Sequence, residues 1–123
     1  MDFGLLIVPD AAAAATQARL AEANGFSRYW VPDSKLMAAD PYVALAAAAL
    51  ATRRIVLGAG VAIAGKRIAP VTACAIASVG ALAPGRVVLG LGTGNSARCS
   101  RCILSRCARR EASSICLARA SGK

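Results

Sequence analysis

The sequence predicts an α/β protein with parallel strands, and three observations support this fold class. Four short apolar runs alternate with three helix-forming segments between residues 3 and 92. Each strand-plus-helix unit takes roughly 25 to 30 residues, close to the size of a βαβ unit. A helix between two strands carries the chain back to its starting edge, so the strands run parallel. Two architectures fit this order: an open doubly wound sheet, or the first half of an eight-stranded barrel.

The first unit is a strand followed by an alanine-rich helix. The run FGLLIV at residues 3–8 ends at Pro9-Asp10, which is typical of a strand covered on both faces. A helix is expected over residues 11–24, because Asp10 can cap its start and Gly25 suits a left-handed C-cap.

The second unit begins with RYWVPD at residues 28–33, a second buried strand that again closes with Pro-Asp. The clearest helix signal of the chain follows. Asp40 stands at the N-cap and Pro41 at the first helical position, while Arg53-Arg54 follow near the negative end of the helix dipole.

The third strand is predicted over residues 55–63, with glycines near its end. A helix opens at Pro70 or Thr72 and runs to Ala83, where Pro84-Gly85 breaks it. RVVLGLG at residues 86–92 predicts a fourth strand.

The composition changes after Ala97. Residues 98–123 show no sustained period of two or 3.6 residues, so we expect coil and divide the chain into a body, residues 1–97, and a tail, residues 98–123. The body holds eight basic and five acidic residues, whereas the tail holds seven basic and one acidic residue. One hypothesis is that the reading frame slips near codon 97 of a GC-rich gene, which would leave a truncated and inactive remnant.

The tail raises two further hypotheses. Its charge could hold nucleic acid through phosphate contacts, but it lacks aromatic residues for base stacking, so we expect no dedicated nucleic-acid partner. Cys99, Cys102, Cys107 and Cys116 could bind zinc, yet their spacing lacks the paired C-x-x-C repeats of zinc ribbons, and we predict no metal site.

The start of the chain, MDFGLLIVPD, carries an acid where a signal peptide has positive charge. We therefore expect a cytoplasmic protein with reduced cysteines. The longest uncharged stretch, residues 68–85, contains two prolines and polar residues that make it a poor bilayer helix, so no membrane partner is expected.

Polar residues and glycines follow all four predicted strands, which in a parallel array lie on a common face. Asp10 is better explained as a helix cap, whereas Asp33 precedes a longer loop and is a candidate for a site. The run GLGTGN at residues 90–95 matches neither the dinucleotide fingerprint nor a P-loop. The chain has no histidine, so the reaction chemistry is expected to come from an organic cofactor.

Taken together, FGLLIVPD, GFSRYWVPDS, DPYVALAAAALATRRIVLGAGV and LAPGRVVLGLGTGNSA resemble the opening half of a luciferase-like flavin or deazaflavin oxidoreductase. The resemblance spans residues 3–97 and implies the first four βα units of a TIM-type (β/α)8 barrel. It also implies the deazaflavin coenzyme F(420), or alternatively FMN, and either hydride transfer or oxygen insertion on a small organic substrate.

The resemblance assigns the site residue by residue. Asp33, the bulge at Gly60-Val61, and Thr93 with Gly94 match the cofactor-binding positions, and such enzymes often hold a non-prolyl cis peptide at that bulge. Ser34 and Asn95 match substrate-facing positions. Ser34 replaces a histidine found in several deazaflavin enzymes, and Asn95 replaces the acid of sugar-phosphate dehydrogenases, which argues against sugar-phosphate oxidation. A half barrel leaves strand edges and inner residues uncovered, so self-association is expected.

Overall fold

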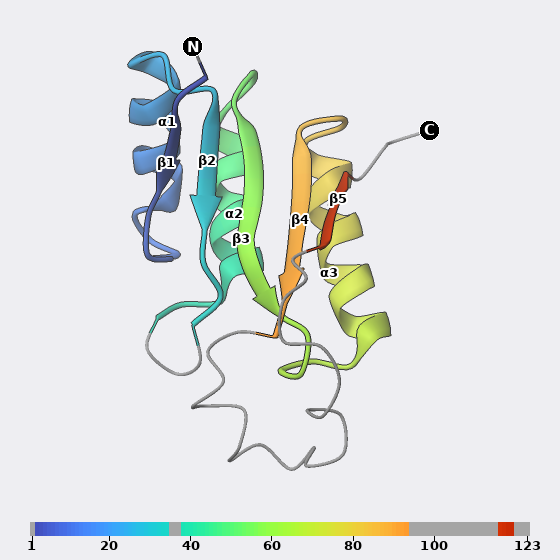
Figure 1. The fold of residues 1–123 in the computed structure, drawn as a ribbon. Coiled ribbons are helices and arrows are strands. Elements are labelled where there is room, and N and C mark those ends of the chain that lie inside the picture. The colour runs from blue at the N-terminus through green and yellow to red at the C-terminus, as the bar shows by residue number, and fades with distance from the viewer. Residues whose placement is uncertain (1, 35–37, 94–115, 120–123) are drawn as a thin grey trace.

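The computed structural model describes residues 2–34, 38–93 and 116–119, in which three helices lie on one face of a five-stranded sheet (Figure 1). In chain order the elements are β1 (Gly4–Leu6), α1 (Ala14–Ala23), β2 (Arg28–Val31), α2 (Pro41–Ala51), β3 (Val56–Ile63), α3 (Ala69–Leu82), β4 (Val87–Gly92) and β5 (Cys116–Arg119).

The sheet has the strand order β1-β2-β3-β4-β5, and β1 to β4 pair in parallel. Each strand therefore lies next to its neighbour in sequence, with its helix always on the same face (Figure 1). A doubly wound sheet reverses its strand order and carries helices on both faces. The observed order excludes that alternative and is the order of a (β/α)8 barrel.

The edge of β4 is covered by β5, which runs antiparallel to it with Leu89 opposite Ala118 and Leu91 opposite Cys116. We expected coil throughout residues 98–123, and the structure differs at these four residues. The physical reason is that β4 presents a row of backbone N–H and C=O groups, which an extended segment can pair with whatever its side chains.

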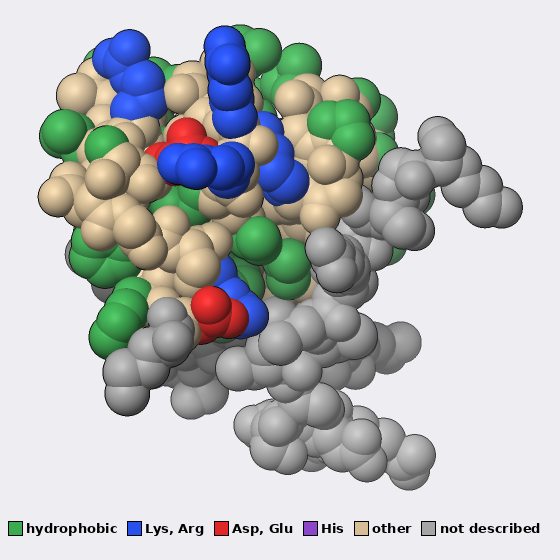
Figure 2. Space-filling view, turned by 90° about the horizontal axis from the view of Figure 1, so that it is seen from above, with side chains coloured by type: hydrophobic (Ala, Val, Ile, Leu, Met, Phe, Trp, Pro, Cys, Tyr) green, Lys and Arg blue, Asp and Glu red, His purple; other side chains and the backbone are tan. Residues whose placement is uncertain are grey.

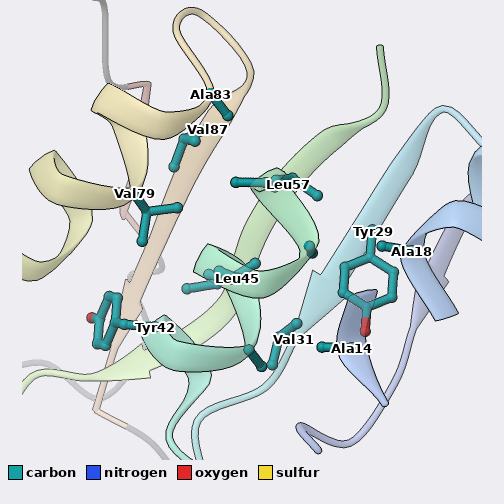
Figure 3. Packing of buried hydrophobic residues seen from close by; sticks show 14 of the residues in the cluster. Ala14, Ala18, Tyr29, Val31, Tyr42, Leu45, Leu57, Val79, Ala83 and Val87 are labelled. Carbon is teal, nitrogen blue, oxygen red and sulfur yellow. The ribbon is translucent and has the colours of Figure 1, made fainter. Parts of the chain in front are cut away.

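The core lies between the helices and one face of the sheet (Figure 3). Tyr29 and Val31 of β2, Leu57 of β3 and Val87 of β4 are fully buried there, together with Leu45 of α2. Alternate residues of each strand point to this face, as the strand period of two requires. Because most of the helix residues in this core are alanines, the helices can approach the sheet closely.

Tyr29 shows how small helix residues accommodate a large strand residue. Its ring packs against α1, next to Ala14 and Ala18 (Figure 3), and its hydroxyl donates a hydrogen bond to Gln17 Oε1 at 3.1 Å. Burial, with a smaller contribution from the Asp10 charge, raises the pKa of the Tyr29 hydroxyl. The phenol therefore stays protonated at neutral pH and anchors β2 to α1.

The opposite face of the sheet carries Trp30 over a glycine. A Cβ atom at Gly58 would lie 2.2 Å from the Trp30 ring, and one at Gly4 would lie 3.2 Å from its Nε1. The indole thus covers part of both neighbouring strands. Leu6 and Val8 lie on the same face and are each 64% exposed, so this face is apolar and largely uncovered among the described residues.

The predicted start of α2 and end of α1 agree with the structure, whereas α1 begins at Ala14 and not at residue 11. The Asp40 side chain accepts a hydrogen bond from Tyr42 N at 2.9 Å, and Pro41 occupies the first turn of α2. Gly25 follows the C-cap of α1 with φ +82°, and Gly85 has φ +71° in the turn before β4. These are left-handed conformations that favour glycine.

The end of the molecule where the strands begin gathers arginines around an acidic side chain (Figure 2). Arg86 donates to the Thr52 and Ile55 carbonyl oxygens, each at 3.0 Å, and thereby ties β4 to the end of α2. The Glu22 carboxylate accepts hydrogen bonds from the backbone N–H groups of Arg53, Arg54 and Ile55. This end of a barrel usually serves stability.

Glu22 connects α1 to the start of β3, and its ionised form is the one that the fold stabilises. Burial raises the pKa of this carboxyl, but the three backbone hydrogen bonds and the Arg54 charge outweigh it, and the net pKa is lowered. A lowered folded-state pKa means that the contribution to stability is complete above the unfolded value of about 4.3. This contribution is lost as the pH falls through the pKa that Glu22 has in the folded protein.

The substitution Glu22→Gln is expected to lower the free energy of unfolding at pH 7 by about 1 kcal/mol, since a neutral amide oxygen is a weaker acceptor than a carboxylate. Urea unfolding at several pH values measures the effect, and the difference from the wild type should shrink between about pH 5 and pH 3. Asp2→Asn is the matched control, because Asp2 is 72% exposed and its contact with Arg28 is 3.5 Å long. An equal loss at pH 3 and pH 7 would contradict this role of Glu22.

Candidate functional site

The carboxyl ends of the parallel strands meet along one edge of the sheet, as Figure 1 shows for β2, β3 and β4. Backbone hydrogen bonds join the segments beyond the strands. Asp33 N donates to Val61 O at 3.2 Å, and Ala64 N donates to Gly92 O at 3.0 Å. Because Gly92 directly precedes Thr93, the residues that follow β2, β3 and β4 lie close together in space.

The Asp33 carboxylate is buried at this edge and has two partners from the segment around the end of β3. Lys66 Nζ donates to Oδ1 at 2.5 Å, and the backbone N–H of Ile63 donates to Oδ2 at 3.2 Å. The Asp33 side chain is only 1% exposed, whereas that of Lys66 is 23% exposed. The loop after β2 is therefore held against the loop after β3 by an ion pair and a backbone hydrogen bond.

A second ion pair, between Arg67 and Asp40, also joins the loop after β3 to the loop after β2. The Arg67 guanidinium binds the Asp40 carboxylate and lies over the Tyr42 ring, 4.8 Å from its centroid. Asp40 also caps α2, so Arg67 fixes the start of that helix. Burial is the main cause of a raised pKa for the Tyr42 hydroxyl, which stays protonated beneath the guanidinium.

Strand β3 carries a β-bulge at the predicted position. The register between β3 and β4 shifts between Ala59 and Ala62, so Gly60 and Val61 form the irregular part. A Cβ atom at Gly90 would lie 2.6 Å from Gly60 O and 2.8 Å from Ala59 O. Only glycine at position 90 leaves room for the bulged backbone. The family resemblance implies a cis peptide at this bulge, but every peptide bond of the described residues is trans.

The structure brings four of the predicted site residues to this edge: Asp33, Gly60, Val61 and Thr93. Ser34 is there too, and its carbonyl oxygen lies 3.3 Å from Lys66 Nζ. Thr93 is exposed directly after β4. The other two predicted site residues, Gly94 and Asn95, lie outside the described residues, as do three of the four tail cysteines.

Asp10 caps the turn before α1 and not the helix itself, whose N-cap is Ala13 without a side-chain hydrogen bond. Asp10 Oδ1 accepts hydrogen bonds from Ala12 N at 3.0 Å and Ala13 N at 3.4 Å, in the turn that leads into α1. The Pro9 carbonyl oxygen accepts from Ala39 N at 3.2 Å, which joins the end of the β1 segment to the loop before α2.

Sequence reasoning missed Lys66, the nearest charged neighbour of Asp33. A signal was available, because the basic pair Lys66-Arg67 follows the third strand while Asp33 and Asp40 flank the loop after the second. Adjacent parallel strands place such loops side by side, so opposite charges in them are candidates for pairing. The pairing partner of each charge nevertheless depends on the loop conformation.

The arrangement suits a planar, largely apolar ligand. On the sheet face opposite the core, Leu6 Cδ1 lies 3.2 Å from the position of a Cβ atom at Gly60, and the carbonyl oxygens of Ala59 and Gly60 fill the space beside Gly90. A flat ring on this face would therefore contact the Leu6 side chain. Leu6 and Val8 supply apolar surface on that face, while Lys66 and Thr93 supply hydrogen-bond donors at the edge. These groups fit a flavin or deazaflavin ring. They also fit a cofactor that carries the redox chemistry while the protein places it.

This fold and site define an α/β-barrel enzyme family. The model of the luciferase-like monooxygenase family matches residues 4–101, and the chain belongs to that family.

Two similar proteins are named as reductases of methanopterin compounds. A 5,10-methylenetetrahydromethanopterin reductase of Methanolobus tindarius is 38% identical over 99 residues, which are 79% of this chain and 30% of the relative. The structure of the coenzyme F(420)-dependent tetrahydromethanopterin reductase of Methanopyrus kandleri is 31% identical with a TM-score of 0.71. The match covers 78% of this chain and 28% of that one. The chain thus spans less than a third of the length of these relatives.

A third similarity concerns the fold alone. The oxygenating constituent of 3,6-diketocamphane monooxygenase from the CAM plasmid of Pseudomonas putida, a type II Baeyer-Villiger monooxygenase solved with FMN, gives a TM-score of 0.71 at 20% identity. The match covers 81% of this chain and 32% of the monooxygenase. The same fold therefore occurs in an F(420)-dependent reductase and in a monooxygenase that binds FMN.

The substitution Gly90→Ala is expected to lower the free energy of unfolding by about 1–3 kcal/mol, because its methyl group meets backbone atoms that cannot rotate away. Chemical unfolding measures the loss, and the amide signals of residues 59–62 in an NMR spectrum should shift with it. Gly65→Ala is the matched control, since a Cβ atom at Gly65 meets nothing within 4 Å. Equal stability of the two variants would show that the bulge does not depend on Gly90.

Proposed function

We propose that this chain binds a deazaflavin coenzyme of the F(420) type at the strand-end edge and serves hydride transfer between that coenzyme and a small organic substrate. Identity to two reductases over nearly four-fifths of the chain supports this choice, and one of them is F(420)-dependent. The FMN-bound monooxygenase supports the second candidate, FMN-dependent oxygen insertion, only through its fold. The observation that carries the proposal is the juxtaposition of Asp33, the Gly60-Val61 bulge and Thr93 at one edge.

The proposed residue roles are those of binding and orientation. When bound, the deazaflavin would supply the hydride-accepting and hydride-donating carbon. Beside the β3 bulge the ring would lie on the Leu6 side chain that covers Gly60, and Val61 would contact the ring next to it. Thr93 and Gly94 would bound the same ring from β4, and Asp33 would hold the loop after β2 in place. Ser34 and Asn95 are proposed to face the substrate.

A titration with F(420) and, separately, with FMN tests the proposal through the absorbance and fluorescence of each cofactor. We expect F(420) to bind about tenfold or more tightly than FMN, a difference of about 1.4 kcal/mol. The variant Gly60→Val should weaken binding about tenfold, because its side chain would push Leu6, whose Cδ1 lies 3.2 Å from the Gly60 Cβ position, into the space of the ring. Gly65→Val is the matched control in a loop with open space around it.

Each result has a defined meaning. Tighter binding of FMN would favour the monooxygenase function over hydride transfer. The absence of any change with either cofactor would overturn the proposal and favour the interpretation of the chain as an inactive remnant. Retention on DNA that disappears with added salt would instead favour the nucleic-acid hypothesis.

We propose further that, without cofactor, the chain associates with itself in a cytoplasmic setting through the sheet face that carries Leu6 and Val8, which the bound ring would otherwise cover. The exposure of both side chains supports this, because contiguous exposed apolar surface marks sites of association. None of the helices among the described residues has the length and apolarity needed to cross a bilayer.

Sedimentation velocity over a range of protein concentrations measures this association. The wild type should form dimers or larger species, and Leu6→Glu should shift it towards the monomer because a buried charge opposes the contact. Leu50→Glu is the matched control, since Leu50 is 75% exposed on α2, away from that face. A monomeric wild type at all concentrations would overturn the proposed self-association.

A further inference from the structure

The Lys66 ammonium group has two acceptors, and both belong to the loop after β2. Its Nζ lies 2.5 Å from Asp33 Oδ1 and 3.3 Å from Ser34 O. Its backbone N–H donates to Ile63 O at 3.0 Å, so the main chain of this residue is held as well. An ammonium group carries three donors. One donor therefore has no protein acceptor among the residues that the structure describes.

The two members of the ion pair differ in their exposure to an approaching ligand. Both carboxylate oxygens of Asp33 have donors, Lys66 Nζ for Oδ1 and Ile63 N for Oδ2. The Asp33 side chain is 1% exposed, whereas the Lys66 side chain is 23% exposed. A ligand that approaches the strand-end edge from solvent meets the ammonium group, while the carboxylate is enclosed.

We propose that Lys66 is the residue of this site that hydrogen-bonds the ligand and that Asp33 is its positioning residue. The inference rests on the proposed function for the class of ligand, a planar ring that carries carbonyl oxygens. The Asp33 carboxylate already balances the charge of the ammonium, so the pair offers a hydrogen bond and little net charge. That property suits a neutral carbonyl oxygen better than a phosphate group.

The family resemblance implies that Asp33 contacts the ligand, whereas here Lys66 makes that contact and Asp33 holds Lys66 in position. If Asp33 contacted the ligand itself, Asp33→Asn would weaken binding more than Lys66→Met. If Lys66 makes the contact, Lys66→Met removes the donor. The amide oxygen of Asp33→Asn still accepts from the ammonium group, although its NH2 group then faces the Ile63 N–H. Asp33→Ala removes that acceptor and should lie between the two.

The experiment titrates the full chain and its variants with F(420), FMN and riboflavin, which has the ring but no phosphate. We expect Lys66→Met to weaken all three about tenfold and Asp33→Asn to weaken them less than about threefold, the range of one hydrogen bond to a neutral acceptor. Arg19→Met removes an exposed positive charge on α1 and is the matched control. Circular dichroism of each variant establishes that it folds.

A second readout does not depend on affinity. Acetylation of the lysines, followed by mass spectrometry, should show that riboflavin protects Lys66 relative to Lys123, because the ligand covers the ammonium group. Without ligand, Asp33→Ala should make Lys66 react faster than in the wild type, and Asp33→Asn should restore the slower rate. If the Asp33–Lys66 pair has only a structural role, riboflavin will not protect Lys66 from acetylation.

The outcomes separate the inference from the proposed function. Ligand binding by the wild type with a larger loss in Asp33→Asn than in Lys66→Met overturns the inference and leaves the proposed function standing. A loss confined to FMN and F(420), with riboflavin unaffected, also overturns it, because the contact would then be to phosphate. If the wild type binds none of the three probes, the proposed function and the inference fail together.

Discussion

The parallel pairing of β1 to β4 in chain order is the constraint on which the rest of the structure depends. It brings the four carboxyl ends to one edge and leaves the helices on one face. The core then forms on the helix face, around Tyr29, Leu45 and Leu57, while the other face stays apolar and open. The proposed site residues that the structure describes lie at the edge that this pairing creates: Asp33, Ser34, Gly60, Val61 and Thr93. In parallel α/β proteins function gathers where strands end.

The two ends of the sheet use polar side chains differently. At the strand starts, Glu22 and Arg86 bind backbone groups and so join one element to the next. At the carboxyl ends, Lys66 and Arg67 bind carboxylates of the neighbouring loop, which fixes one loop against another. Gly65, next to Lys66, has open space around it. Loops fixed against each other in this way suit the placement of a cofactor.

Much of the fold could be predicted because its signals are local. Asp40 and Pro41 specify the start of α2, and Gly25 specifies the end of α1, through backbone preferences that act within one turn. Asp10 stabilises the turn before α1 through the same kind of short-range hydrogen bond. The antiparallel strand β5 could not be predicted in this way, since it forms by pairing to an available edge and its side chains carry no strand pattern.

The sequence by itself determined the strand and helix order, and hence which residues follow strand ends, because propensities, caps and apolar periods act over a few residues. The resemblance of the strand-end motifs already favoured the barrel order over the doubly wound order, and the tertiary structure confirmed it. Only the tertiary structure paired Asp33 with Lys66 across 33 positions of the chain. The same holds for Gly90, whose requirement arises from the bulged backbone of a neighbouring strand. These features depend on which segments meet in space, and no local pattern in the chain encodes that meeting.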